Sequence, residues 1–271
     1  MGYFLVIGGT GVMGTAAIQA VRAEFGEEAI IVANWYGKEV PGFKIEKANH
    51  TIFGDITDPK CVNEIKAISS GKFDYMFYAT ALGEVGFPIL DTTPEQVAQS
   101  NKLSFNPIMA LENTFNIGTI VTYSTFYTLK HQQCSYGAMG YSKEAIEKWA
   151  VLPGKSKRLC IRAGLFESQS SRGIKLLLRK TAKHIEDIKS PLLRSYFEGV
   201  STSEGIQKFE KGIINEELEV YGDSPTNQES LYQAHLRMFK SDNAVFINVC
   251  GGKIWESQEP LLLKDHVTAP V

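Results

Sequence analysis

The stretch that decides the fold is Tyr3-Phe-Leu-Val-Ile-Gly-Gly-Thr-Gly-Val-Met-Gly14. An apolar run enters a turn with glycines at positions 8, 11 and 14, and an amphipathic stretch follows. In a strand–turn–helix unit such glycines allow a tight turn and close helix packing, and the helix N-terminus faces a pyrophosphate. The alternative is a turn with only a structural role. We predict dinucleotide contacts at Gly8, Thr10, Gly11, Val12, Met13 and Gly14.

Beyond this turn, short apolar runs alternate with helical stretches, which is typical of a parallel sheet covered by helices. Seven strands are expected: Tyr3 to Gly8, Ala29 to Asn34, His50 to Phe53, Tyr75 to Thr80, Thr119 to Ser124, Arg158 to Arg162 and Ala244 to Val249. Helices are expected near residues 12–25, 59–69, 94–113 and 136–150. The pattern predicts an α/β fold, a single Rossmann-type domain over residues 1–271 with a doubly wound parallel sheet of about seven strands.

Composition narrows the class of protein. The 271 residues carry 28 Lys and Arg against 30 Asp and Glu, a net charge of 28 − 30 = −2, so a nucleic-acid-binding or membrane-surface protein with a wholly basic body is excluded. No apolar run approaches the roughly 20 residues of a membrane helix, and the N-terminus lacks a basic leader. The four cysteines form no CxxC pair. Reduced thiols in a cytoplasmic protein are therefore expected.

Three further segments are expected to contact the cofactor. Asp55 and Ile56 follow the third strand, where they can contact adenine; a helix-capping role for this Asp-rich segment is the alternative. The second strand ends in Asn34-Trp-Tyr-Gly-Lys38 without the carboxylate usual in NAD-dependent folds, and Lys38 can pair with a 2′-phosphate, so NADP is slightly favoured over NAD. The small residues Ala79, Thr80 and Ala81 are expected near the adenosine ribose.

The helix after the fifth strand carries the candidate catalytic residues. It contains Tyr136 and Lys143, and Ser124 ends the preceding strand. Seven residues at about 100° each come to within about 20° of two full turns, so Tyr136 and Lys143 can share one helix face. Asn101, on the preceding helix, is a weaker candidate for a proton relay; a helix-surface role is its alternative.

With its glycine turn, its Asp55-Ile56 pair and Lys143, the chain resembles the short-chain dehydrogenase/reductase superfamily. Met139 stands where most members have their tyrosine, but Tyr136-x-x-Met-Gly-x-x-Lys143 is similar to the active-site segment of enoyl-[acyl-carrier-protein] reductases, although the glycine turn is not of their usual kind. This resemblance implies NAD(P)H-dependent reduction of an enoyl thioester, with Tyr136 stabilising the enolate and Lys143 holding the nicotinamide ribose. It also implies an aromatic residue at the substrate, Phe126 or Tyr127, and a homodimer or homotetramer.

Two other functions remain open from the residues. A ketone or aldehyde reductase would use Ser124 with Tyr136, and a dinucleotide-binding regulator would bind cofactor without turnover. No HExxH motif or cluster of carboxylates is present, so no catalytic metal is expected.

The segment 165–242 is long and mainly helical, and it is expected to bind the substrate, a small acyl thioester or carbonyl compound. Within it, four cations lie on an amphipathic stretch that starts at Gly173. They can face an acidic acyl carrier protein, or they can be an ordinary solvated helix face. These cations are Lys175, Arg179, Lys180 and Lys183.

Overall fold

The fold is built on one sheet of eight strands in the order β3-β2-β1-β4-β5-β6-β7-β8. We describe residues 2–263 from a computed structural model. All pairs are parallel except the last, between β7 and β8. The strands are β1 (Tyr3–Ile7), β2 (Ile30–Trp35), β3 (His50–Phe53), β4 (Lys72–Tyr78), β5 (Asn116–Thr125), β6 (Lys157–Ala163), β7 (Phe246–Cys250) and β8 (Lys253–Ser257). The α/β architecture predicted from the sequence is confirmed.

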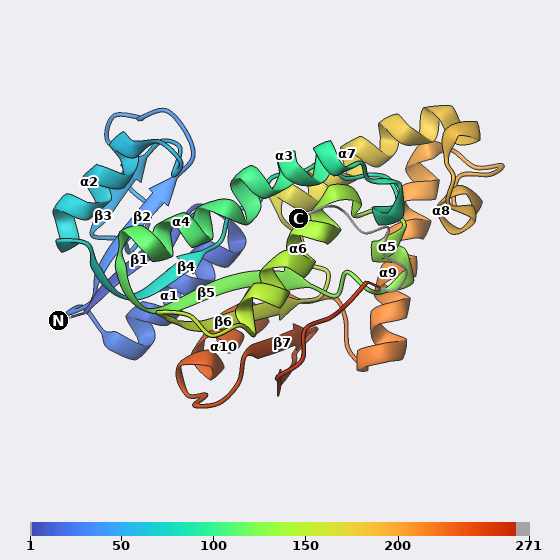
Figure 1. The fold of residues 1–271 in the computed structure, drawn as a ribbon. Helices are drawn as coiled ribbons and strands as arrows, with labels where there is room; N and C mark the ends of the chain where they lie inside the picture. The colour runs from blue at the N-terminus through green and yellow to red at the C-terminus, as the bar shows by residue number, and fades with distance from the viewer. Residues whose placement is uncertain (1, 264–271) are drawn as a thin grey trace.

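Helices cover both faces of the sheet (Figure 1). They are α1 (Val12–Phe25), α2 (Pro59–Ser69), η1 (Ile89–Asp91), α3 (Pro94–Ser104), α4 (Asn106–Thr114), α5 (Lys130–Gln133), α6 (Gly137–Ala150), α7 (Gln169–Thr181), η2 (Ala182–Asp187), α8 (Pro191–Ser195), α9 (Thr202–Tyr221) and α10 (Gln228–Phe239). One apolar core joins α1 and α10 to the sheet, and a second joins α2, α4 and α6 to its opposite face. This two-sided burial explains why the strands are nearly continuous apolar runs.

The eighth strand was not expected from the sequence. After the Gly251-Gly252 turn, β8 returns antiparallel along β7, and none of its five residues is fully buried. Its sequence, Lys-Ile-Trp-Glu-Ser, has only two apolar residues, as is possible for an edge strand that is partly exposed to solvent. The buried apolar runs that predict the strands of a parallel sheet are absent from β8.

The predicted helix over 94–113 is two helices. Phe105 lies between α3 and α4 with φ −130° and ψ −51°. Pro107 lies in the first turn of α4, and because proline has no N–H it cannot donate the hydrogen bond that would continue α3. The chain therefore changes direction at Phe105.

The segment between β6 and β7 is helical, as expected, and contains α7 to α10. Its first part has a separate apolar cluster in which Leu178 of α7, Leu193 of α8 and Phe209 of α9 are buried. All four cysteines are buried and unpaired. Within residues 2–263, no helix has the length and apolarity needed to cross a membrane.

Candidate functional site

The glycine turn lies at the carboxyl edge of the sheet, between β1 and the N-terminus of α1. Gly8 has φ +82°, and a Cβ there would lie 2.9 Å from the carbonyl oxygen of Ala79. A Cβ at Gly14 would lie 2.3 Å from the Gly8 oxygen, so a larger residue would push the helix off the turn. Gly11 precedes α1 without any side-chain cap. The turn thus offers uncapped N–H groups and a close backbone approach, which is what a pyrophosphate needs.

The segment that follows β4 lies beside this turn. The N–H of Ala79 donates to the carbonyl of Ile7 at 2.8 Å, so the segment after β4 runs directly beside Gly8. Ala81 is exposed, and Ala79 and Thr80 are half-buried. The structure therefore brings residues 79–81 and the glycine turn together at one edge.

The side chain of Asn34 supports this edge from inside. Its amide nitrogen donates to the carbonyls of Ile52 and Gly54, at 3.3 and 3.2 Å, while its backbone oxygen accepts from the N–H groups of Gly8 and Gly9. Its side chain is only 1% exposed. Asn34 therefore holds the glycine turn in place through its backbone, and its amide group does not face the turn's surface.

Of the other residues expected at the cofactor, Asp55 and Ile56 make contacts within the protein, whereas Lys38 is exposed. Asp55 accepts hydrogen bonds from the N–H and hydroxyl of Thr57, at 2.8 and 2.7 Å, whereas the cap of α2 is Asp58, which accepts from the N–H of Lys60. Ile56 is buried in the core on the α2 side of the sheet. Lys38 is exposed in the loop after β2 and has no ion pair among residues 2–263. It remains available to an incoming phosphate.

Lys143 reaches the same edge from α6. Its Nζ donates to the carbonyl of Tyr123 at 2.9 Å. Val121 pairs with Phe77, so Tyr123, two residues further along β5, lies level with Ala79. Burial lowers the pKa of Lys143 to about 8, against the opposing effects of Cys160 and Glu147. The amine thus lies at the same carboxyl edge of the sheet as the glycine turn, and it changes charge close to neutral pH.

Ser124 lies in a buried ionic network. Its Oγ donates to Oε1 of Glu147 at 2.5 Å. Glu147 also accepts from Nε and Nη2 of Arg162, at 3.0 and 2.6 Å. The guanidinium in turn donates to Asn248 at 2.7 Å. The structure therefore joins Ser124 to β6, β7 and α6 and does not bring it to Tyr136.

Tyr136 and Lys143 were expected on one helix face, but α6 begins at Gly137, so Tyr136 lies just outside the helix. Gly137, the first residue of α6, has φ +47°, and a Cβ there would lie 2.5 Å from the oxygen of Glu84. Because Gly137 is left-handed, the direction of Tyr136 cannot be extrapolated along the helix, and the geometric argument for one face is wrong. No hydrogen bond to the Tyr136 hydroxyl is present in the described part of the chain. Burial raises the pKa of Tyr136 to about 12.

The two aromatic candidates for substrate contact, Phe126 and Tyr127, lie in different apolar clusters. Phe126 is buried between Tyr221 and Trp255, with ring centroids 4.2 and 5.8 Å away. Tyr127 is buried in a cluster against which Tyr136 packs. Only Tyr127 therefore lies with the candidate catalytic tyrosine.

Met139 and Asn101 belong to a serine network between α3 and α6. The sulfur of Met139 accepts from the hydroxyls of Ser100 and Ser104, at 3.6 and 3.8 Å. Ser142 donates to Oδ1 of Asn101 at 2.7 Å. The position that usually holds a tyrosine is thus filled by a buried thioether that links two helices.

The cations of α7 and η2 are not equivalent. Lys175 pairs with Glu210 of α9 at 2.6 Å, so it is partly neutralised. Arg179, Lys180 and Lys183 are exposed and have no ion pair among the described residues. Thr181 donates to the carbonyl of Gly86 at 3.1 Å, which holds α7 against the loop after β4.

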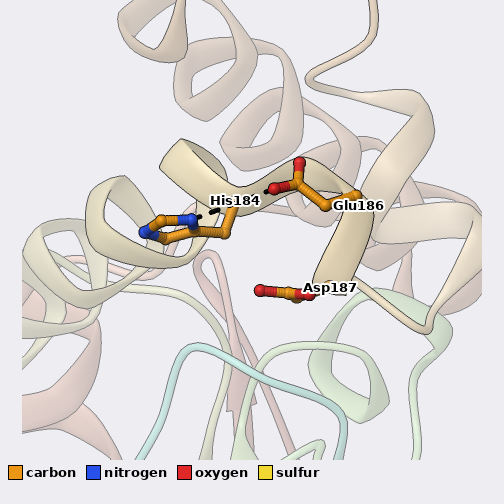
Figure 2. A group of neighbouring side chains, drawn as sticks. All are labelled: His184, Glu186 and Asp187. Atoms are coloured by element: carbon orange, nitrogen blue, oxygen red, sulfur yellow. Dashed lines mark ion pairs between the residues drawn. The ribbon is translucent and has the colours of Figure 1, made fainter.

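One group of exposed metal-ligand types occurs in the described residues, in η2 (Figure 2). His184, Glu186 and Asp187 place their ligand atoms within 4.8 Å of one another, and the His184 and Glu186 atoms are 3.9 Å apart. All three are exposed, and exposed acidic groups of this kind are common without a metal. They lie within the segment between α7 and α8, outside the edge formed by the glycine turn and Lys143.

Sequence reasoning missed the residues that organise this edge, Glu147 and Arg162. Both are nearly inaccessible, at 0% and 3% exposure. A signal was available, since Arg162 interrupts the otherwise apolar run Leu-Cys-Ile-Arg-Ala of β6. Arginine is almost never fully buried without a partner, so this position predicts a buried carboxylate nearby.

Comparison with known proteins assigns the family. The polysaccharide biosynthesis protein family matches residues 4–162, more than half of the chain. The chain belongs to this family. The match runs from β1 to β6 and so contains the glycine turn, Lys143 and nearly all of the ionic network. No curated protein matches the chain in sequence.

Solved structures share the fold. A short-chain dehydrogenase family protein from Francisella tularensis subsp. tularensis SCHU S4 matches with 18% identity and a TM-score of 0.61, over 93% of this chain and 98% of that one. NAD+-bound xylitol dehydrogenase matches with 15% identity and a TM-score of 0.59 over the same shares. A Shigella flexneri 2a str. 301 short-chain dehydrogenase in complex with NADP has 14% identity, a TM-score of 0.50 and coverage of 64% and 80%. The family member described here therefore has the short-chain dehydrogenase/reductase fold.

Proposed function

We propose that this chain is an NAD(P)H-dependent oxidoreductase that reduces the double bond of an enoyl thioester. The observation that carries the cofactor part is the open glycine turn at the N-terminus of α1, with Lys143 reaching the same edge. Gly8 and Gly14 stand where a Cβ would clash with backbone, so the cradle fits a closely approaching dinucleotide. Two structures of the same fold are of complexes with NAD+ and NADP, which supports this assignment.

The enoyl part rests on the Tyr136-x-x-Met-Gly-x-x-Lys143 segment. A bound reduced nicotinamide supplies a hydride to the β-carbon, and a proton from water completes the saturated thioester at the α-carbon. Tyr136 keeps its proton at neutral pH, because burial raises its pKa to about 12, and can donate it as a hydrogen bond to the thioester oxygen as charge develops. Lys143, whose amine lies at the carboxyl edge, positions the ribose hydroxyls.

The partner that fits this substrate is an acidic acyl carrier protein. Arg179 and Lys180 of α7 and Lys183 of η2 provide unpaired positive charge, and α7 lies against the loop after β4. We expect the assembly to be a homodimer or homotetramer, as the resemblance implies.

The test is to titrate NADH and NADPH and then to follow their oxidation with crotonyl and acetoacetyl thioesters. The proposal predicts oxidation with the crotonyl compound and a loss of at least about 100-fold in Tyr136→Phe, the size of a lost oxyanion donor. Tyr232→Phe, on α10 across the sheet, is the matched control and should retain full activity. Oxidation only with acetoacetyl thioester would favour a ketone reductase, and cofactor binding without oxidation would favour a regulator.

A second candidate follows from the family match, which suggests a precursor of a polysaccharide as substrate. The same assay with a nucleotide-activated hexose distinguishes it. Turnover of the hexose but not of the crotonyl thioester would replace the enoyl assignment and leave the cofactor assignment intact.

A further inference from the structure

Residues 259–263, which we call the strap, follow β8 and lie against α6. Two glutamates on neighbouring turns of α6 hold it by its backbone. Oε2 of Glu147 accepts the N–H of Leu261 at 2.7 Å, and Oε1 of Glu144 accepts the N–H of Leu263 at 2.9 Å. A carboxylate that accepts a backbone N–H makes a strong, charge-assisted hydrogen bond, so the strap has a defined register on the helix.

Two further contacts fix the same register. The hydroxyl of Tyr127 donates to the carbonyl of Leu261, and Nη2 of Arg162 donates to the carbonyl of Glu259 at 3.4 Å. The anchored residues are 259, 261 and 263, an alternation that places neighbouring side chains on opposite sides of an extended segment. Leu263 is accordingly 4% exposed, whereas Leu262 is 53% exposed.

The inward side of the strap lies beside the candidate catalytic tyrosine. Leu263 belongs to a buried cluster with Ile89 and Tyr127, and Leu261 and Tyr136 pack against that cluster. The members of this cluster are aliphatic or aromatic, and the Tyr136 hydroxyl has no hydrogen-bond partner within residues 2–263. A surface of this kind beside a hydrogen-bond donor suits an apolar chain attached to a polar reacting group.

We propose that Leu261 and Leu263 are specificity-determining residues that form the wall of the substrate site beside Tyr136 and limit the length of the acyl chain. The inference rests on the proposed enoyl reduction. Glu144 and Glu147 hold the wall at a fixed distance from the tyrosine, so shortening either leucine lengthens the space available to the chain. Leu262, on the opposite side of the strap, has no such effect.

The experiment measures kcat/KM for trans-2-enoyl N-acetylcysteamine thioesters of 4, 8 and 12 carbons with NADPH. Leu263→Ala and Leu261→Ala should each raise the ratio for the longest over the shortest substrate by about tenfold, because two to three methylene groups gain buried space. Leu262→Ala is the matched control and should leave the ratio unchanged. An unchanged ratio in the two inward variants, or an equal change in the control, would overturn the proposal. Leu261 is only partly buried, so Leu261→Ala carries the test if Leu263→Ala does not fold.

A second measurement separates failure of the wall from failure of the proposed function. Nitration of Tyr136 by tetranitromethane, mapped by mass spectrometry with Tyr136→Phe as the blank, reports whether the strap covers the ring without any turnover. We expect slow nitration in the parent and in Leu262→Ala, and at least about fivefold faster nitration in the inward variants. If no thioester is reduced but nitration follows this pattern, the enoyl assignment fails and the covering strap stands. If nitration is equal in all variants, the strap does not cover Tyr136 and the proposal is wrong.

Discussion

Ser124 donates its hydroxyl proton to Glu147 across 2.5 Å, inside a network that also holds Arg162. A hydroxyl has a single proton, so in this arrangement Ser124 has none to donate to a substrate oxygen. The side chain sits at the end of β5, where a ketone reductase would need a donor. The hydrogen bond to Glu147 therefore bears directly on the choice between an enoyl reductase and a ketone reductase.

Ser124→Ala should lower kcat/KM for crotonyl thioester by less than about threefold, while the free energy of unfolding falls by about 1–3 kcal/mol because buried Glu147 loses a donor. Steady-state kinetics and urea denaturation measure the two effects. A loss of about 100-fold in turnover with unchanged stability would instead place Ser124 at the reacting oxygen. That outcome would favour the ketone reductase.

Gly14→Ala should abolish tight cofactor binding, because the new Cβ would lie 2.3 Å from the carbonyl oxygen of Gly8. We expect the Kd for NADPH to rise by at least about tenfold, since α1 must move away from the turn that it packs against. Gly173→Ala, on α7, is the control: a Cβ there meets nothing within 4 Å. Fluorescence titration measures both variants, and equal Kd values would remove the glycine turn from the cofactor site.

Lys38→Ala tests the preference for NADP. Lys38 is exposed in the loop after β2, and an exposed ion pair contributes up to about 1 kcal/mol, or about fivefold in Kd. The Kd for NADPH should rise by that factor, and the Kd for NADH should stay the same. Lys44→Ala, in the same loop, should change neither value. A parallel loss for both cofactors would show that Lys38 does not recognise the 2′-phosphate.

Lys143→Met should make the protein more stable at pH 7. Burial lowers the pKa of Lys143 to about 8, below its ordinary value of 10.5, so the folded state disfavours the ammonium form. Below pH 8 both folded and unfolded chains carry this proton, and the full cost of up to about 3 kcal/mol is present. Between pH 8 and 10.5 the unfolded chain binds more protons, so the parent gains stability as the pH rises and the two proteins converge.

Urea denaturation of both proteins from pH 6 to 10 measures this difference, which should shrink above pH 8. A constant difference across that range would mean that Lys143 titrates normally. The same ionisation should lower kcat/KM of the parent above pH 8, because the uncharged amine holds the ribose hydroxyls less strongly.

Much of the fold followed from sequence periodicity. The seven apolar strands and the glycine turn appear where they were expected, because burial on both faces leaves a strong apolar pattern. The edge strand β8 and the break at Phe105 were missed. The first has no continuous apolar run, and the second depends on the missing N–H of Pro107 within an apparently continuous helical stretch.

The site was less predictable than the fold because its organisation depends on contacts between distant segments. Sequence spacing put Lys143 on the correct helix but could not reveal that Gly137 is left-handed, so the direction of Tyr136 could not be extrapolated from the helix. Glu147 accepts hydrogen bonds from residues of β5, β6 and the strap, which are far apart in the sequence. No sequence motif links these three segments. Only the arginine within an apolar strand pointed to a buried partner.

The bond between Leu261 and Glu147 joins residues 114 positions apart and has a consequence for synthesis of the chain. A nascent polypeptide that has emerged only through β6 can pair Glu147 with Arg162, but the wall beside Tyr136 is still missing. Residues 259–263 must leave the ribosome before that wall can form. The tyrosine therefore stays uncovered until residues 259–263 have been made, and the candidate site is completed after the parallel part of the sheet that carries it.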